Sequence, residues 1–153
     1  MGGVGSVMVP VEIADLIPLS IEPAAYVVLL LDRQQGRCLS ITMGGFEGQS
    51  LERGLNGSSA PRPLTHQLMA HMLQVLGAEL EEVCIVRWEG ATYYATAQIR
   101  QGEEVKVLDC RPSDALNLAV LAGRPIYVSE EVFAQGGRPY SEEVARWRGA
   151  KGS

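Results

Sequence analysis

The sequence predicts a single α+β domain built on a mixed, strongly twisted sheet, and three observations support this fold class. The chain has 153 residues, of which 46% are hydrophobic and 20% are charged, so it has enough apolar side chains for one buried core. Apolar runs of strand length alternate along the chain with apolar or amphipathic stretches of helix length. Glycine and proline residues separate these stretches, as expected at turns and helix ends.

The first half of the chain is expected to contain a strand, a hairpin and a helix. Residues 1–6 are rich in glycine and are predicted to be disordered, whereas residues 7–17 alternate imperfectly between apolar and polar positions, as in a strand. Residues 26–43 contain two apolar runs on either side of an Arg-Gln-Gln-Gly turn, which predicts a hairpin. Residues 46–55 then predict a helix that is weakened by two glycines.

The second half repeats this order after a connecting helix. Thr65 is expected to cap an amphipathic helix that runs to Leu76 and packs across the sheet. Period-2 patterns and a glycine-containing turn then predict three more strands. These strands are expected at residues 83–88, 93–100 and 105–109.

Residues 109–128, DCRPSDALNLAVLAGRPIYV, combine polar residues with a predicted helix and a strand. Pro112 biases the preceding residue away from helical angles, and Ser113 is expected to be the N-cap of the helix. This helix should be buried nearly all round because Asn117 is its only polar residue beyond the first turn. Gly123 suits the end of the helix, and a short strand follows it.

The C-terminal part of the chain is expected to contribute little to the core. Residues 129–133 predict a short helix, and residues 136–153 form a polar tail with one helical turn expected around residues 142–147. The domain is therefore expected to span residues 7–135. Its predicted core consists of Val27, Leu29, Leu31, Ile41, Leu68, Leu73, Ile85, Val107, Leu116, Ala119 and Ile126.

The common order of the two halves leads us to infer an internal duplication. Each half contains a hairpin that turns at an Arg-Gln sequence followed by glycine, and then a helix. Glu47 follows Gly36 at nearly the same distance at which Asp114 follows Gly102, so each half places a carboxylate near a helix N-terminus. The alternative explanation is that such units are common and that the match is a coincidence.

The charge and the cysteine content narrow the expected partners and the cell compartment. A net charge of −5 at pH 7 argues against general electrostatic attraction to nucleic acids or anionic membranes. Cys38, Cys84 and Cys110 are too few and too scattered for a disulfide framework or a zinc site. The chain lacks a signal segment, and its longest apolar run, residues 24–31, is far too short to span a bilayer. We therefore expect a cytoplasmic protein without a membrane partner.

Four charged residues near the predicted helix starts are candidates for one site. Asp109 and Arg111 are two positions apart on an extended segment, Asp114 follows them, and Glu47 is the counterpart of Asp114 in the first half. Carboxylates that share a site repel one another unless a cation lies among them, and oxygen-rich sites suit Mg²⁺ or Mn²⁺. Glu47, Asp109 and Asp114 are thus the predicted metal ligands. The alternative is an Asp109–Arg111 ion pair and two carboxylates that only stabilise helix ends.

Histidine and arginine side chains complete the predicted site. His66 lies in the first turn of the connecting helix, and histidine is the side chain best suited to proton transfer near neutral pH, so it is expected to protonate a leaving oxygen. Arg62 and Arg111 are expected to bind phosphate, because guanidinium groups form paired hydrogen bonds with phosphate oxygens. Cys110, beside Arg111, fits an activated thiolate, but a small buried core residue is the preferred interpretation.

Three blocks of the sequence carry a resemblance to a known family. They are residues 109–115 (DCRPSDA), residues 62–66 (RPLTH) and residues 44–47 (GGFE). The first block resembles the D-x-R-P-S-D-A signature of the bifunctional nuclease family, and the resemblance extends over residues 7–133. It implies a compact mixed α/β domain, usually oligomeric, with DNase and RNase activity ascribed to some members. The polar residues that correspond are Glu47, His66, Asp109, Arg111, Ser113 and Asp114.

The resemblance and the charged residues together predict a nuclease that hydrolyses phosphodiester bonds of DNA or RNA with a divalent cation held at helix N-termini. Two positions depart from the family pattern: Gly48 stands where the family prefers Ala, and Cys110 replaces a small residue. The acidic balance leaves an alternative open, a non-catalytic regulatory module that binds an anion or a partner. A homo-oligomer, dimeric or larger, is expected from the family and from the long apolar run that starts at Tyr26.

Overall fold

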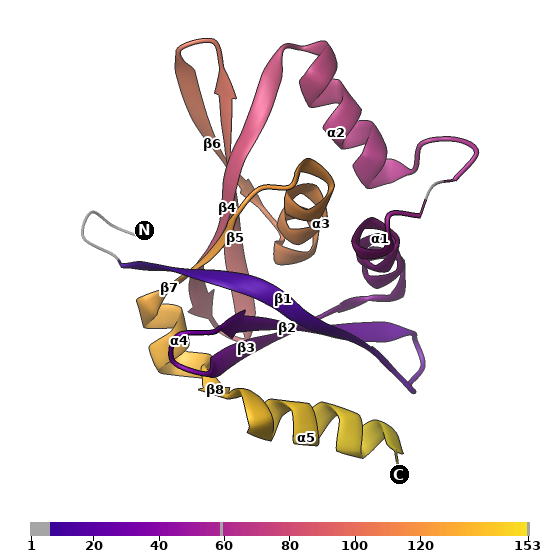
Figure 1. Cartoon of the computed structure of the whole chain (residues 1–153), viewed down its shortest axis with the longest axis vertical. Helices are drawn as coiled ribbons and strands as arrows, with labels where there is room; N and C mark the ends of the chain where they lie inside the picture. Colours follow the sequence, from indigo (N-terminus) through magenta and orange to yellow (C-terminus); the bar gives the residue numbers. More distant parts are fainter. Residues whose placement is uncertain (1–6, 59, 153) are drawn as a thin grey trace.

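The computed structural model describes residues 7–58 and 60–152, which form one eight-stranded sheet and five helices (Figure 1). The predicted disorder of residues 1–6 lies outside these described residues. The strands are β1 (Met8–Leu19), β2 (Ala25–Asp32), β3 (Arg37–Gly44), β4 (Ala78–Glu89), β5 (Thr92–Gln101), β6 (Glu104–Cys110), β7 (Ile126–Ser129) and β8 (Arg138–Pro139). The helices are α1 (Gly45–Asn56), α2 (Thr65–Val75), α3 (Pro112–Ala122), α4 (Glu130–Gly136) and α5 (Tyr140–Gly152).

The sheet is mixed, and it changes direction at β1. Its strand order is β6-β5-β4-β7-β1-β2-β3-β8, in which β4 and β7 are parallel and the other neighbours are antiparallel. β1 pairs with β7 through Met8–Val11 and with β2 through Glu12–Leu19, with a register shift between Ile13 and Asp15. Strand β1 pairs with β7 along its first part and with β2 along the rest. The sheet twists between these two parts, so β1–β3 run across the direction of β4–β6 (Figure 1). The predicted mixed sheet is confirmed.

Two three-stranded meanders, each followed by a helix, lie on either side of β7. β1, β2 and β3 lead into α1, while β4, β5 and β6 lead into α3, and α2 connects the two sets. The hairpin turn at residues 33–36 is found where the sequence predicts it. The internal duplication that this order suggests is not confirmed and stays a prediction.

The helix starts differ from those expected from the sequence. α3 begins at Pro112 with Arg111 as its N-cap, so Ser113 lies inside the first turn. Pro112 explains this difference because its fixed φ angle suits the first helical position. α2 likewise begins at Thr65 with Leu64 as its N-cap. The predicted capping roles of Ser113 and Thr65 are therefore wrong.

The C-terminal ends of α1 and α3 agree with the prediction. Gly57 and Gly123 follow these helices with φ angles of 66° and 64°, in the left-handed conformation that glycine adopts without strain at Cβ. Each glycine ends its helix, and the two helices are of similar length, with 12 residues in α1 and 11 in α3.

The main core lies between one face of the sheet and helices α1, α3 and α4. Leu30 of β2, Ile85 of β4 and Leu116 of α3 are fully buried in it. α3 is nearly enclosed, as predicted: residues 115–119 are all buried, including Asn117. The start of α3, which carries the polar residues of the predicted site, is thereby held in a fixed position against the sheet.

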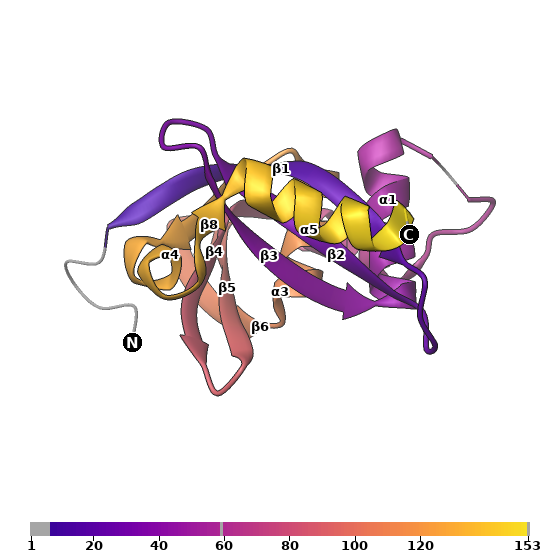
Figure 2. The ribbon, with the colours of Figure 1, turned by 90° about the horizontal axis from the view of Figure 1, so that it is seen from below.

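A second core lies on the other face of β2, beneath α5. Helix α5 lies against β1, β2 and β3 (Figure 2). Val27 is fully buried in this core, and Tyr140, Val144 and Trp147 of α5 pack against it. The sequence prediction of a polar tail with one helical turn around residues 142–147 therefore underestimates this segment, which forms β8 and all of α5.

Most predicted core residues are buried, but two of these predictions are wrong. Leu68 is 53% exposed because it lies on the outer side of α2. Val107 is 60% exposed because β6 is the outermost strand and both of its faces are uncovered. Those confirmed as buried are Val27, Leu29, Leu31, Ile41, Ile85, Leu116, Ala119 and Ile126, and Leu73 is partly buried against the core.

Packing inside a single copy of the chain accounts for the continuous apolar run of β2. Alternate side chains of β2 enter the two cores, with Val28 and Leu30 in one and Val27 and Leu29 in the other. This run therefore gives no support to the expected homo-oligomer, which stays a prediction. None of the helices in the described part of the chain combines the length and the apolar character needed to cross a membrane.

Candidate active site

Arg111 joins the starts of α1 and α3. It is the N-cap residue of α3, and Glu47 and Asp114 lie in the first turns of α1 and α3. The Arg111 guanidinium donates from Nε to Asp114 Oδ2 at 3.0 Å, from Nη2 to Asp114 Oδ1 at 3.1 Å and from Nη1 to Glu47 Oε2 at 3.2 Å. One cation thus bridges the two carboxylates that the sequence places at corresponding positions.

His66 brings the start of α2 into the same site. It lies in the first turn of α2, and only 6% of its surface is exposed. Its Nε2 lies 2.8 Å from Asp114 Oδ1, and its Nδ1 lies 2.7 Å from the hydroxyl oxygen of Ser50. Both ring nitrogens of this buried histidine therefore have a hydrogen-bond partner, one on α3 and one on α1.

These contacts form one hydrogen-bonded cluster, which we call the helix-start cluster. Ser50 lies one turn after Glu47 on α1, so a series of contacts that leaves α1 at Glu47 returns to it at Ser50. The N-termini of three helices meet at this cluster, and each carries a partial positive charge that favours a bound anion. The members of the cluster are Glu47, Ser50, His66, Arg111 and Asp114.

Asp114 is held in its ionised form by its partners. Burial of the carboxyl group acts to raise its pKa, but the hydrogen bonds from Arg111 and His66 outweigh burial, and the pKa of Asp114 lies below its usual value. An ionised carboxylate can only accept hydrogen bonds, so His66 Nε2 carries a proton. In the neutral imidazole Nδ1 is then the acceptor, and the Ser50 hydroxyl donates to it.

The structure gathers four of the predicted site residues and leaves two apart. Glu47, His66, Arg111 and Asp114 belong to the helix-start cluster. Asp109 is exposed on β6, and Arg62 is exposed in the segment before α2; neither side chain forms an ion pair or hydrogen bond with another described residue. The alternative prediction of an Asp109–Arg111 ion pair is wrong, because Arg111 forms ion pairs with Glu47 and Asp114 instead.

The predicted Mg²⁺ or Mn²⁺ site does not fit the residues as they are arranged. Within residues 7–58 and 60–152, no three His, Cys, Asp or Glu side chains are grouped in a way that could hold a metal ion. The Arg111 guanidinium stands between Glu47 and Asp114, and Asp109 lies outside the cluster. A cation could bind between these carboxylates only if the Arg111 side chain moved away.

Two residues of the site were not predicted from the sequence. Ser50 has no local signature, although its spacing of three from Glu47 places both on one face of α1. Asn117 donates to the backbone oxygens of Glu47 at 3.2 Å and Ser113 at 2.9 Å, so it ties α3 to the start of α1. A single polar residue in an otherwise apolar helix is the sequence feature that could have indicated this bonding role of Asn117.

Cys110 is not an activated thiolate. Burial, together with the nearby carboxylates of Asp114 and Asp109, raises the pKa of its thiol to about 11. The thiol therefore stays protonated at neutral pH, which agrees with the preferred interpretation of a core residue.

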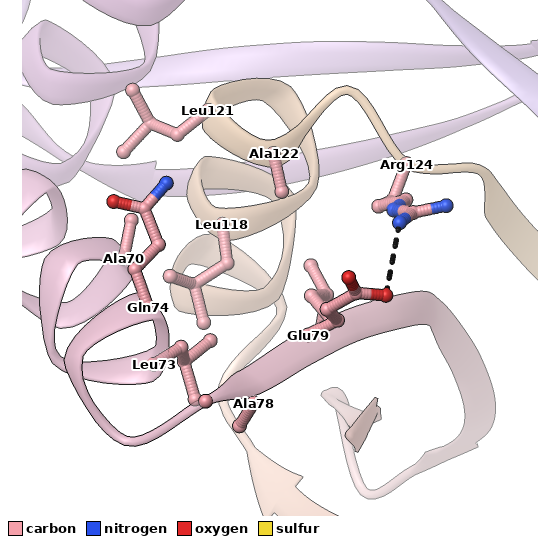
Figure 3. Close-up of a pocket in the computed structure, with 11 residues that line it drawn as sticks. Ala70, Leu73, Gln74, Ala78, Glu79, Leu118, Leu121, Ala122 and Arg124 are labelled. Atoms are coloured by element: carbon pink, nitrogen blue, oxygen red, sulfur yellow. Dashed lines mark ion pairs between the residues drawn. The ribbon is translucent and has the colours of Figure 1, made fainter. Parts of the chain in front are cut away.

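A pocket of about 500 Å³ lies at the opposite ends of α2 and α3 from the helix-start cluster (Figure 3). Its lining includes Leu73 and Leu118, with Arg124 and Glu79 forming an ion pair of 3.6 Å beside them. Among the described residues that line the pocket, none is a histidine, serine or cysteine. The helix-start cluster, by contrast, contains both a histidine and a serine.

Comparison with known proteins agrees with the resemblance seen in the sequence. Residues 28–141 match the family described as the bifunctional nuclease domain. The chain is 38% identical over 117 residues to a protein of Mycobacterium tuberculosis, named as uncharacterized in two strains, and covers 70% of its length. It is 26% identical over 111 residues to Bifunctional nuclease 1 of Arabidopsis thaliana; the match spans 71% of this chain and 34% of that protein. The chain therefore belongs to the bifunctional nuclease domain family.

Proposed function

We propose that this protein is a nuclease that hydrolyses phosphodiester bonds of DNA or RNA at the helix-start cluster. The observation that carries the proposal is the hydrogen-bonded series Arg111–Asp114–His66 at the meeting point of three helix N-termini. It combines a group that binds anions with a group that moves protons. The family match adds support, because a relative is named a bifunctional nuclease.

Arg111 is the proposed phosphate-binding group. Its side chain is 62% exposed although it also bridges Glu47 and Asp114, so its outer face is open to solvent and to a ligand. A guanidinium group forms paired hydrogen bonds with phosphate oxygens, and the helix N-termini add favourable potential. Arg62, which is exposed just before α2, is proposed as a second contact to the phosphate.

His66 is the proposed acid–base group. Asp114 accepts from Nε2 and so fixes the imidazole tautomer whose Nδ1 is a proton acceptor. In that form His66 removes a proton from the attacking oxygen and then returns it to the leaving oxygen. Glu47 and Asp114 hold Arg111 and His66 in position for these steps.

We propose no step that uses a divalent cation, because Arg111 occupies the space between the two carboxylates. The Mg²⁺ or Mn²⁺ prediction is tested with a chelator. Cleavage that survives the chelator supports the acid–base account, whereas cleavage that the chelator abolishes would support the metal site and require Arg111 to move.

The proposed function is tested by cleavage of labelled single-stranded DNA and RNA with the purified protein. Asp114→Asn keeps the size of the side chain but removes its charge, and cleavage should fall by about 10²- to 10⁴-fold. Asp109→Asn is the matched variant outside the cluster, and its loss should be much smaller. Equal losses in the two variants, or no cleavage by the wild-type protein, would contradict the proposal.

A binding module is the second candidate function, and one observation favours it. α2 and β6 expose apolar side chains, including Val75 at the end of α2 and Val107 on β6. Such surfaces often mark contacts with a partner or with another copy of the chain, so the expected homo-oligomer remains part of this proposal. Light scattering at micromolar concentration that gives only the monomer mass of 16.5 kDa would count against an oligomer.

A further inference from the structure

We infer that Ser50 is a nucleophile activated by His66 and Asp114, so that the three residues form a serine–histidine–aspartate triad. The inference goes beyond the proposed nuclease function, which assigns no nucleophile, but it rests on that function for its substrate class, the phosphate ester. Ser50 comes from α1, His66 from α2 and Asp114 from α3, so the triad exists only in the folded chain.

The distances meet the requirements of such a triad. The Ser50 hydroxyl oxygen lies 2.7 Å from His66 Nδ1, and His66 Nε2 lies 2.8 Å from Asp114 Oδ1. Both values fall within the hydrogen-bond range expected between a nucleophile, its base and the group that orients the base. Because Asp114 fixes the proton on Nε2, the electron pair that can receive a proton is directed at Ser50.

The surroundings of Ser50 suit a reaction at phosphorus. Ser50 is half-buried on α1, one turn after Glu47, whose carboxylate accepts from the exposed Arg111. The same Arg111 also holds Asp114. A phosphate ester bound by Arg111 would therefore be contacted by a cation that belongs to the same cluster as the nucleophile.

The hydroxyl of Ser50 is engaged by the histidine and not by the helix. A serine inside a helix commonly donates to the backbone oxygen four residues earlier. Here the hydroxyl group points across to another helix and meets an imidazole nitrogen. This is the contact that raises the nucleophilic character of a serine oxygen, which is weak without an adjacent base.

The reaction follows from these contacts. The Ser50 oxygen attacks phosphorus while His66 Nδ1 takes the hydroxyl proton, so an O–P bond forms to serine. The bond from phosphorus to the leaving oxygen breaks, and the imidazolium gives its proton to that oxygen. Water then attacks the serine phosphodiester, with His66 again accepting and returning the proton, and Ser50 is regenerated.

Covalent labelling with diisopropyl fluorophosphate tests the triad without any nucleic acid. The serine oxygen displaces fluoride from phosphorus, and the adduct is found by mass spectrometry of the intact protein and of its peptides. We expect one adduct on Ser50 of the full chain and none on Ser50→Ala. His66→Gln and Asp114→Asn should label at least about 100-fold more slowly, because each removes part of the base.

Ser113→Ala is the matched control, since Ser113 is a buried serine in the first turn of α3 whose hydroxyl is not part of the cluster. It should label as the wild type does. Absence of an adduct on Ser50, or an equal labelling rate in His66→Gln, would overturn the inference.

The outcomes separate this inference from the proposed function. If Ser50 is labelled and no nucleic acid is cleaved, the triad stands and the nuclease proposal fails. If nucleic acid is cleaved at the wild-type rate by Ser50→Ala, and Ser50 takes no label, the nuclease proposal stands and the nucleophile is a different group.

Discussion

Two arginines of this protein each bridge a pair of carboxylates, and their surroundings differ. Arg37 at the start of β3 donates to Asp32 at 3.0 Å and to Glu130 at 2.6 and 2.9 Å. Arg111 bridges Glu47 and Asp114 with the same kind of contacts. The Arg37 side chain is only 19% exposed, whereas that of Arg111 is 62% exposed.

The difference lies in what covers each cation and in what its carboxylates contact next. The guanidinium of Arg37 stacks on the ring of Phe133 at 4.3 Å, so its face is closed by an apolar side chain. Asp114, by contrast, is bonded to His66 as well as to Arg111, and the other ring nitrogen of His66 contacts the Ser50 hydroxyl. An arginine that bridges two carboxylates is therefore not itself evidence of a site. The open guanidinium and the attached histidine are what distinguish the helix-start cluster.

Exchange of each arginine for alanine tests this comparison and should give the largest effects. Arg111→Ala is expected to lower cleavage by about 10²-fold or more, because the phosphate loses its main partner. Its effect on the free energy of unfolding should be at most about 1 kcal/mol, as for exposed ion pairs. Cleavage rates and urea denaturation curves measure the two quantities.

Arg37→Ala should show the opposite pattern. It leaves the buried carboxylate of Asp32 without its cation, which should lower the free energy of unfolding by about 3 kcal/mol. Cleavage by the folded protein should remain close to that of the wild type. A large loss of cleavage in Arg37→Ala, with stability unchanged, would break the comparison.

Gly48→Ala tests how α1 supports the cluster. A Cβ atom at Gly48 would lie 2.1 Å from Cδ1 of Tyr26, so α1 or the ring must shift, at a cost of about 1–3 kcal/mol in stability. The shift also moves Glu47 and Ser50, so cleavage should fall. This close packing accounts for a glycine where the resemblance leads one to expect alanine.

Gly149→Ala is the control for that experiment, because a Cβ there meets no atom of the described residues within 4 Å. In the helix α5 alanine is the better helix former, so the control should be as stable as the wild type or slightly more stable. Thermal unfolding of both variants measures this difference. Equal midpoints for Gly48→Ala and the wild type would show that α1 tolerates the shift.

Loss of the carboxylate charge beside either arginine should change the pH dependence of stability, and this effect should be smaller than those of the substitutions above. The pKa of Glu130 is lowered mainly by its hydrogen bond with Arg37, and the pKa of Asp114 is lowered by Arg111 and His66 against the effect of burial. A carboxyl group whose pKa is lower in the folded state stabilises the fold above its unfolded pKa of about 4. That contribution is lost as the pH falls through the folded pKa.

Urea denaturation between pH 7 and pH 3 measures this dependence. The free energy of unfolding should fall less steeply below pH 5 in Glu130→Gln and in Asp114→Asn than in the wild type. Only Asp114→Asn should also lose cleavage at pH 7. A variant with the same acid dependence as the wild type would show that its carboxyl group is not stabilised by the arginine.

Local patterns were sufficient to predict most of the fold. The hairpin turn at residues 33–36 and the helix ends at Gly57 and Gly123 follow from glycine and from hydrophobic periodicity, and the structure confirms them. α5 was underestimated because its sequence is mostly polar. The spacing of Tyr140, Val144 and Trp147 on one helical face was nevertheless present in the sequence as a signal.

The candidate site could be predicted only in part. Glu47 and Asp114 were placed together from their positions in corresponding helix starts, and both contact Arg111. The exclusion of Asp109 depends on the course of β6, and the contact of Ser50 with His66 depends on how α1 and α2 both pack against α3. Such contacts between helices have no fixed spacing along the chain, so sequence patterns do not contain them.

The measurement that tests the central claim most directly is the single-turnover cleavage rate of His66→Gln on single-stranded RNA and DNA. Glutamine fills similar space beside Ser50 and Asp114 but cannot accept and return a proton near neutral pH. We expect cleavage at least about 100-fold slower than in the wild type, with the thermal unfolding midpoint lowered by only a few degrees. Cleavage at the wild-type rate by folded His66→Gln would contradict the assignment of the helix-start cluster as the active site.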